Sequence, residues 1–301
     1  MSAESTYADW IAVAYRDRRL CAWAMAGEGT VRAQADTALT GDSGVEEALI
    51  ALLDPWLGQA QIPVIGAGLG SADGAWPALP VVAVPAKPLD LLPVATACSD
   101  PRLRLWRIPG LSQAEPADLM TGDETRIAGF LAANPSFDGV MCLLGLRTCW
   151  VHVSAEEVVS FQTSLTGELF QDLSLGDSLR DAVAAPRMDM AAYGEAVTET
   201  LSRPERLAQR LFSLRAAHLL HGLSPEAARG RLAGLLIGAE LAATRPYWLG
   251  QAVAIAGAQD LVALYASALR GQGVSPLCLE AGLLTQVGLT RYHAAIQEPG
   301  P

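Results

Sequence analysis

The alternation of apolar and polar positions predicts a regular series of strands and helices in the first part of the chain. Two apolar runs separated by the charged residues Arg16–Arg19 are typical of a β-hairpin. Apolar side chains at helical spacing, and apolar runs that end at glycine or proline, predict the elements that follow. In chain order these are strands at 9–15 and 20–26, a helix at 44–58, a strand at 62–68, an extended proline-rich segment at 75–88, a strand and turn at 103–111 and a helix at 121–134.

A second series begins near residue 138 and opens like the first, with a strand, a turn and a strand. A further strand enters a helix at Thr166–Gly167. The rest is predicted to comprise helices over 192–245 with breaks at Pro204 and Ser224–Pro225, a strand at 252–258, a helix, a strand near 274–279 and a C-terminal helix. Two halves that each open with a hairpin favour a duplicated α/β fold over an alternating βαβ array.

The composition is that of a compact protein with a large buried core. Of 301 residues, 51% are hydrophobic and 18% are charged, and this length favours two domains. The net charge of −11 provides no overall basic surface for nucleic acid or an anionic membrane. The chain shows no apolar run of about 18 residues and no signal peptide, so we expect a cytoplasmic protein.

Familiar catalytic and metal-binding motifs do not explain this sequence. The five cysteines and four histidines show no zinc-binding spacing. The segment GAGLGS at 66–71 resembles a dinucleotide-binding loop, but prolines follow where such a loop must open a helix. Neither a GK[ST] phosphate loop nor a GxSxG hydrolase motif is present.

Acidic residues at two predicted helix starts are candidates for chemistry. Asp123 and Glu124 could hold a metal ion, or could be caps that the helix dipole favours. Glu168 could bind a metal or a sugar hydroxyl beside backbone N–H groups, or could be an exposed cap. The pattern leaves both alternatives open. Gly234 and Gly238, four residues apart, predict a helix face that packs closely on another helix.

Six segments, in this order over nearly the whole chain, carry a resemblance to one enzyme family. They are IPGL at 108–111, MTGDET at 120–125, LTGELF at 165–170, RAAHLL at 215–220, LAGLLIGAE at 232–240 and IAGAQDLVALY at 255–265. Together they resemble the 2-dehydro-3-deoxygalactonokinase family, which belongs to the superfamily of acetate and sugar kinases, chaperones and actin.

The resemblance implies an α/β fold of two actin-like (ribonuclease H-like) lobes with an interdomain cleft. The lobes are expected at 1–125 and 126–279, and the C-terminal helix 280–301 could pack on the first. The implied reaction transfers the γ-phosphoryl group of ATP, bound with Mg²⁺, to the terminal hydroxyl of 2-keto-3-deoxygalactonate. The expected partners are this sugar acid and ATP, without nucleic acid or membrane, with a homodimer as a possible assembly.

The resemblance also implies roles for particular residues. The substrate would contact Ser71, Trp76, Thr125, Thr166, Gly167 and Glu168, and the nucleotide would lie near Gly257 and Ala258. If the protein is an active kinase, the candidate catalytic acids are Asp123 and Glu124, the phosphates would lie near Arg16, Gly145 and Arg147, and Asp17 would bind the metal.

Both phosphate-binding hairpins depart from the family pattern. The first is close to IAxDWGTTNLRAW in the family, but here Ala14 replaces the aspartate and Arg16 replaces the glycine. The second is close to PGTHSKW, but residues 144–150 read LGLRTCW, and Gln162 stands where an arginine is usual. Since phosphoryl transfer depends on positioned charge, these losses should weaken catalysis.

Two hypotheses therefore remain. In the first, the protein is an active sugar-acid kinase in which arginines bind the phosphates directly, with Asp17 or Asp123 on Mg²⁺. The arginines in question are Arg16, Arg18, Arg19 and Arg147. In the second, the arginine-rich turn is only a solvated or salt-bridged hairpin, and the protein is a non-catalytic member that binds a sugar acid or a partner protein in a regulatory role.

Overall fold

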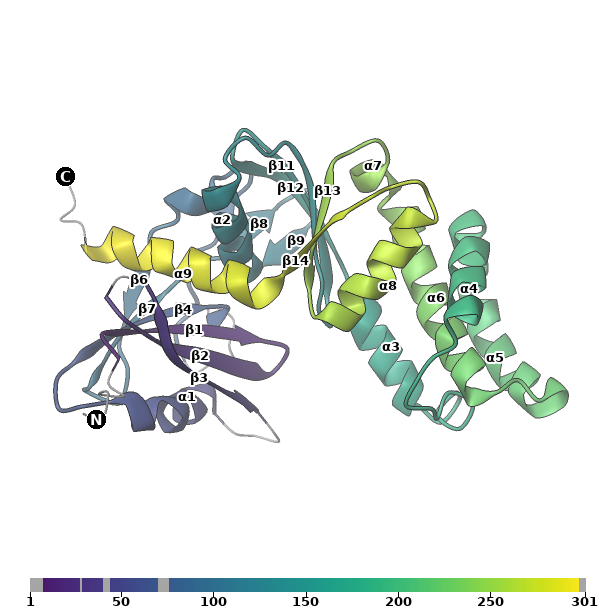
Figure 1. The fold of residues 1–301 in the computed structure, drawn as a ribbon, viewed down its shortest axis with the longest axis horizontal. Helices are drawn as coiled ribbons and strands as arrows, with labels where there is room; N and C mark the ends of the chain where they lie inside the picture. The colour runs from purple at the N-terminus through teal and green to yellow at the C-terminus, as the bar shows by residue number, and fades with distance from the viewer. Residues whose placement is uncertain (1–7, 28, 40–43, 70–75, 298–301) are drawn as a thin grey trace, which may run out of the picture. The chain divides into compact units, whose positions relative to one another are not determined.

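The structure is a computed structural model that describes residues 8–27, 29–39, 44–69 and 76–297 (Figure 1). The chain forms two compact units, each with its own sheet. Unit 1 comprises Met1–Asp138, Val153–Ser160 and Ala281–Pro301, and unit 2 comprises Gly139–His152 and Phe161–Glu280. The C-terminal segment therefore belongs to the same unit as the first hairpin.

Unit 1 is built on a six-stranded sheet with the order β3-β2-β1-β4-β7-β6. The first three strands form an antiparallel meander, whereas β1, β4 and β7 run parallel. The strands are β1 (Trp10–Arg16), β2 (Arg19–Met25), β3 (Val31–Ala38), β4 (Ile62–Ala67), β6 (Val94–Thr96) and β7 (Leu103–Arg107). A smaller sheet consists of β5 (Val82–Ala83), β8 (Leu111–Gln113) and β9 (Asp118–Met120).

Helices cover both faces of the large sheet, because successive side chains of a strand point to opposite sides. Ile11 and Val13 of β1 belong to the buried core that also contains Leu49 and Leu53 of helix α1. On the other face, Trp10 stacks on His293 at a ring distance of 4.1 Å. The helices of unit 1 are α1 (Val45–Leu53), α2 (Asp123–Ala133) and α9 (Ala281–Gln297), with short 3-10 turns η1 (Asp54–Trp56) and η3 (Pro88–Asp90).

Unit 2 is built on a five-stranded sheet with the order β12-β11-β10-β13-β14. Strand β10 pairs in parallel with β13, which in turn pairs in parallel with β14. The strands are β10 (Gly139–Leu143), β11 (Thr148–Ser154), β12 (Glu157–Ser164), β13 (Val253–Gly257) and β14 (Leu277–Glu280). The carboxyl ends of β10 and β13 therefore lie side by side at one edge of the sheet.

The helices of unit 2 pack against this sheet and against one another (Figure 1). They are α3 (Thr166–Leu175), α4 (Met190–Ser202), η4 (Pro204–Arg206), α5 (Leu207–His221), α6 (Pro225–Ala243), α7 (Arg245–Trp248) and α8 (Gln259–Arg270). A Cβ atom added to Gly234 would lie 2.4 Å from the Tyr193 carbonyl oxygen, and one on Gly238 would lie 2.8 Å from that of Val197. The predicted close-packing face of α6 is thus confirmed, and its partner is α4.

Most predicted elements are present, and the main omission is β3. Its sequence, VRAQADTA, alternates only weakly in hydropathy, and its side chains are exposed or half-buried along an edge of the sheet. An edge strand buries little, so it leaves a weak apolar pattern. None of the helices in the described ranges is long and apolar enough to cross a bilayer.

Candidate functional site

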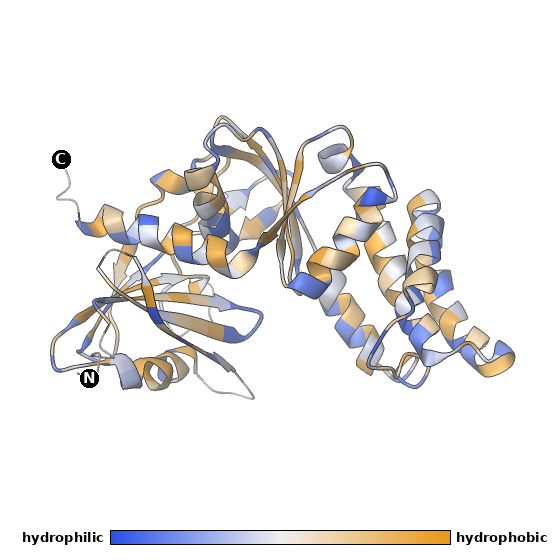
Figure 2. Cartoon of the chain, viewed as in Figure 1, coloured by the Kyte–Doolittle hydropathy of each residue, from blue (hydrophilic) through white to orange (hydrophobic). Residues whose placement is uncertain are grey.

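The turn of the first hairpin is a tight two-residue connection. Asp17 and Arg18 have φ angles of 51° and 57°, in the left-handed region that two-residue hairpin turns require. Arg16 and Arg19 pair across the strands on either side of this turn. The tip of the hairpin is hydrophilic although its strands are largely apolar (Figure 2). The turn therefore brings a cluster of charge to the end of β1.

Two glycines bring the start of α2 against the end of β1. Gly68, just after β4, has a φ of 74°, and a Cβ atom there would lie 2.1 Å from the Tyr15 carbonyl oxygen. Gly122, the residue before α2, has a φ of 97°, and its Cβ would lie 3.2 Å from the Gly68 Cα. Side chains are excluded at both positions by backbone angle and by space. Gly122 lies within the MTGDET segment, but its backbone conformation was not predicted from the sequence.

This close approach places Arg16 in contact with Asp123. The Arg16 guanidinium donates to Asp123 Oδ1, and Arg126 donates to the same oxygen at 3.1 Å. The Arg16 Nε also lies 3.5 Å from Asp17 Oδ2. Asp123 is almost fully buried, whereas about a fifth of the Arg16 side chain is exposed, at 21%. Sequence reasoning missed Arg126, although its i+3 spacing from Asp123 on a helix is a signal for such a pair.

The two predicted catalytic acids have opposite protonation behaviour. Burial alone would raise the pKa of Asp123, but the charges of Arg16 and Arg126 outweigh it and lower that pKa below its usual value. Burial raises the pKa of Glu124 to about 8, and the charge of Asp123 adds to this. Asp123 is therefore a carboxylate at neutral pH, and Glu124 retains its proton.

Glu124 and Thr125 belong to the first turn of α2 and have no exposed surface. Glu124 Oε2 accepts a hydrogen bond from the Gly122 N–H at 2.6 Å, and the Thr125 hydroxyl donates to Oε1 at 3.3 Å. Of the other residues predicted to contact substrate in this unit, Ser71 lies outside the described residues. Trp76 is buried, and its ring lies 5.6 Å from the Arg107 guanidinium carbon.

The turn of the second hairpin packs on the start of α3. Leu146 accepts a hydrogen bond at its carbonyl oxygen from the Glu168 N–H, at 2.9 Å. A Cβ atom on Gly167 would lie 2.7 Å from the Gly145 carbonyl oxygen, so only glycine permits this contact. Arg147 and Glu168 form an ion pair at 3.4 Å with both side chains exposed. Gly145, Arg147, Gly167 and Glu168 are therefore brought together as one cluster.

Behind this cluster lies a buried hydrogen-bond network centred on Glu240. Its carboxylate accepts from the Trp150 Nε1–H at 2.7 Å, from the Tyr265 hydroxyl at 2.8 Å and from the Thr166 hydroxyl. The Tyr265 hydroxyl also lies 3.1 Å from that of Thr148. Burial raises the pKa of Glu240 despite these donors. The network joins α6, β11, α3 and α8, and its centre was not identified from the sequence.

Gly257 and Ala258, predicted to lie near the nucleotide, form the turn between β13 and α8. A Cβ atom on Gly257 would lie 2.7 Å from the Leu144 Cβ, so this glycine lets the end of β13 contact the second hairpin. Ala258 precedes α8 in an extended conformation, and no side chain caps this helix start. The turn thus lies beside the second hairpin at the same sheet edge.

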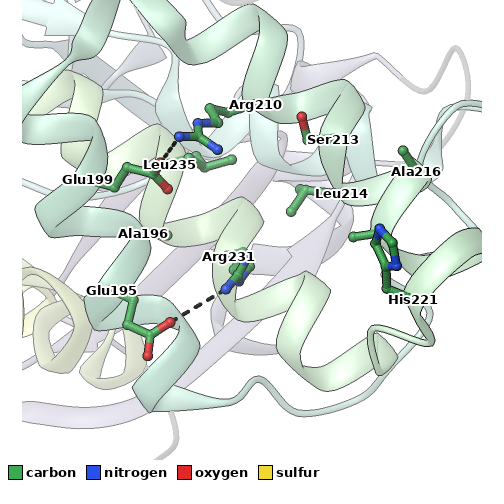
Figure 3. A pocket seen from close by; sticks show the side chains of 11 residues that line it. Glu195, Ala196, Glu199, Arg210, Ser213, Leu214, Ala216, His221, Arg231 and Leu235 are labelled. Atoms are coloured by element: carbon green, nitrogen blue, oxygen red, sulfur yellow. Dashed lines mark ion pairs between the residues drawn. The ribbon is translucent and has the colours of Figure 1, made fainter.

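A hollow of about 360 Å³ lies among α4, α5 and α6 of unit 2 (Figure 3). Its charged walls are largely neutralised by ion pairs. Glu199 pairs with Arg210, and Glu195 lies 3.5 Å from Arg231. None of the catalytic, substrate-binding, nucleotide-binding or metal-binding residues predicted from the sequence lines this hollow.

A metal ion held by this chain does not fit the observed side chains. Asp17 and Asp123, the two metal ligands considered from the sequence, both form ion pairs with Arg16, and Asp123 is also paired with Arg126. Within the described ranges, no three side chains of histidine, cysteine, aspartate or glutamate come together as a metal site would require. The donor set of the first hairpin is thus already neutralised by arginine.

Comparison with known proteins identifies the family of this chain. The family model of 2-keto-3-deoxy-galactonokinase matches residues 17–292. A protein of Rhizobium meliloti described as a probable 2-dehydro-3-deoxygalactonokinase is 30% identical over 284 residues, covering 91% of this chain and 93% of its own. The 2-dehydro-3-deoxygalactonokinase of Escherichia coli is 30% identical over 296 residues, covering 96% of this chain and 99% of its own.

Solved structures agree with this assignment. A crystal structure of a candidate 2-dehydro-3-deoxygalactonokinase from Sinorhizobium meliloti superimposes with a TM-score of 0.85 at 30% identity, covering 95% of this chain and 99% of its own. Component A of the (R)-2-hydroxyglutaryl-CoA dehydratase of Acidaminococcus fermentans has a TM-score of 0.54 at 12% identity over 95% of this chain and 98% of its own, which shows the fold alone. The expected fold of actin-like α/β lobes is confirmed. The chain belongs to the 2-keto-3-deoxy-galactonokinase family.

Proposed function

We propose that this protein is a sugar-acid kinase that transfers the γ-phosphoryl group of ATP to the terminal hydroxyl of 2-keto-3-deoxygalactonate. The observation that carries the proposal is the family match from residue 17 to residue 292, which begins at the turn of the first hairpin and includes the second hairpin and the start of α2. Mg²⁺ would bind together with ATP, as a component of the MgATP substrate. The ionised carboxylate at the start of α2 supports this chemistry.

Asp123 is the best candidate to contact the sugar hydroxyl. Phosphoryl transfer has a loose transition state, so orienting the attacking oxygen and balancing charge matter more than a strongly basic group. Asp123 is ionised at neutral pH and is held in position by Arg16 and Arg126. Glu124, the next residue of α2, is fully buried and accepts a hydrogen bond from the Gly122 N–H. We therefore propose that Glu124 positions the start of α2 and does not touch the substrate.

In unit 2, we propose that the cluster at the second hairpin lies near the nucleotide. Gly145 and Arg147 would face its phosphates, and Gly257 and Ala258 would lie near the adenosine. The Thr166 hydroxyl already donates a hydrogen bond to Glu240, so Thr166 would position the start of α3 and would not contact the substrate. Arg147 and Glu168 are exposed, which leaves their side chains accessible to a substrate.

The test is a coupled assay of ATP consumption with 2-keto-3-deoxygalactonate and its C4 epimer as alternative acceptors. We expect turnover with at least one of them, reduced roughly 10²–10³-fold in Asp123→Asn because one positioned charge is lost. Asp54→Asn is the matched control. It removes the same charge from an exposed ion pair with Arg102, and should leave turnover unchanged.

Absence of turnover with every acceptor, in protein shown to be folded by circular dichroism, would refute the proposal. Calorimetry with ATP and with each sugar acid then separates the alternatives. Binding of a sugar acid without turnover would indicate the non-catalytic, regulatory member considered from the sequence.

A further inference from the structure

We infer that the guanidinium group of Arg16 supplies the positive charge at the turn of the first hairpin. It would bind phosphate oxygens there in place of a metal ion held by the protein. This goes beyond the proposed function, from which it takes only the assumption that phosphate groups approach this turn. The inference predicts anion binding at the hairpin that does not require a metal.

The position of Arg16 is determined by the backbone around it. Arg16 is the last residue of β1, and the contacts of Gly68 and Gly122 with this strand end bring the first residue of α2 within reach. Its guanidinium then lies against Asp123, which is only 6% exposed. Because Arg16 remains about one-fifth exposed, its charge is still accessible from solvent at the turn.

The charges of this cluster balance without a metal. Two guanidinium groups, those of Arg16 and Arg126, face two carboxylates, those of Asp17 and Asp123. Both carboxyl oxygens of Glu124 are engaged by the protein, one by the Gly122 N–H and the other by the Thr125 hydroxyl. Ala14, which pairs with Cys21 and Ala67 within the sheet, supplies no oxygen ligand.

A divalent cation would be disfavoured at these carboxylates. Mg²⁺ and Mn²⁺ are bound through carboxylate oxygens and water, and the carboxylates here are engaged by arginine. A metal ion on Asp123 Oδ1 would lie within a few ångströms of two guanidinium groups, where repulsion between like charges is strong in a partly buried site. An arginine, by contrast, binds phosphate oxygens directly through its planar N–H groups.

The first experiment titrates Mn²⁺ into the wild-type protein without nucleotide and follows the signal of free Mn²⁺ by electron paramagnetic resonance. We expect the signal to match that of buffer across the titration, because no site removes the ion from solution. Stoichiometric Mn²⁺ binding that is lost in Asp123→Asn would overturn the inference. This measurement needs only the wild-type protein to fold.

The second experiment measures inorganic tripolyphosphate binding by calorimetry in the presence of EDTA. We expect the wild-type protein to bind without metal, and Arg16→Gln to bind on the order of tenfold to a hundredfold more weakly, since a charge-assisted hydrogen bond is lost. Arg16→Lys, which keeps the charge, should recover part of the affinity. Arg32→Gln removes the same charge from an exposed pair with Asp9 in the same sheet and should change the affinity less than threefold.

Failure of wild-type tripolyphosphate binding in EDTA, or equal weakening in Arg16→Gln and Arg32→Gln, would also overturn the inference. Neither experiment depends on turnover. A protein that phosphorylates a sugar acid but holds Mn²⁺ at Asp123 would retain the proposed function and refute this inference. A protein without turnover that binds tripolyphosphate through Arg16 would refute the proposed function and support this inference.

Discussion

Each of the two hairpin turns carries an ion pair between an arginine and an acid, but the first pair is nearly buried and the second is exposed. In each, an arginine of the turn forms an ion pair with an acid in the first turn of a helix that packs beside it. Arg16 meets Asp123 of α2 in a nearly buried contact, whereas Arg147 meets Glu168 of α3 with both side chains exposed. Burial of the first pair makes each partner dependent on the other, since an unpaired buried charge is costly.

The buried carboxylates behind the two turns differ in a similar way. Asp123 is held by two guanidinium charges, and its pKa is lowered. Glu240 is held by three neutral donors, those of Trp150, Thr166 and Tyr265, and burial raises its pKa. Charge compensation therefore outweighs burial at Asp123, whereas hydrogen bonds from neutral donors do not outweigh it at Glu240.

Removing the charge of Asp123 should have the largest effect on stability. Asp123→Asn leaves Arg16 and Arg126 without their shared counter-ion, and we expect a loss of about 3–5 kcal/mol in the free energy of unfolding. Urea unfolding at pH 7 measures it, with Asp54→Asn as the exposed control. A loss equal to that of the control would show that Arg16 and Arg126 do not depend on this carboxylate.

Replacing Glu240 should have a smaller effect, because its partners are uncharged. Glu240→Gln keeps one acceptor oxygen but turns an N–H group toward donors, which should cost about 1–3 kcal/mol in the free energy of unfolding. Glu168→Gln, in the same unit but exposed, should stay within about 0.5 kcal/mol of wild type. A double-mutant cycle with Thr166→Val checks the contact, and strictly additive effects would contradict a shared hydrogen bond.

The raised pKa of Glu124 predicts a pH dependence of stability. Between its usual value of 4.5 and about 8, Glu124 holds its proton in the folded protein but loses it on unfolding. The free energy of unfolding therefore falls as pH rises through this window, by at most about 1.4 kcal/mol per pH unit from this group. In Glu124→Gln this contribution is absent, so the stability of the variant relative to wild type should rise from pH 5 to pH 8.

Urea unfolding of wild type and Glu124→Gln at several pH values measures that difference. A difference that stays constant between pH 5 and pH 8 would mean that Glu124 does not titrate in this window.

Breaking the exposed pair of the second hairpin should have the smallest effect on stability. Arg147→Ala removes an ion pair that solvent screens, so the free energy of unfolding should change by about 0–1 kcal/mol. If the proposed nucleotide site is correct, the same variant should bind ATP more weakly, as calorimetry would show. A large loss of stability with unchanged ATP binding would assign Arg147 a structural role instead.

The sequence predicted most elements of the fold because hydropathy and glycine or proline breaks are local signals. The hairpins, the helix at Asp123 and the long helical region after residue 190 all follow from spacing within one element. The edge strand β3 was not predicted, because it buries too little to leave a clear pattern. The family resemblance was confirmed by the match over residues 17–292.

The sequence by itself determined which residues are present at the two hairpins. Compared with the family pattern, the first hairpin has Arg16 in place of glycine and Ala14 in place of aspartate, and acids occupy the helix starts at Asp123 and Glu168. Only the tertiary structure decided their partners. Arg16 and Asp123 are 107 positions apart, and Trp150 and Glu240 are 90 apart, so no local pattern links them. Burial and pairing set the charge of a carboxylate, and both arise only when distant segments pack together.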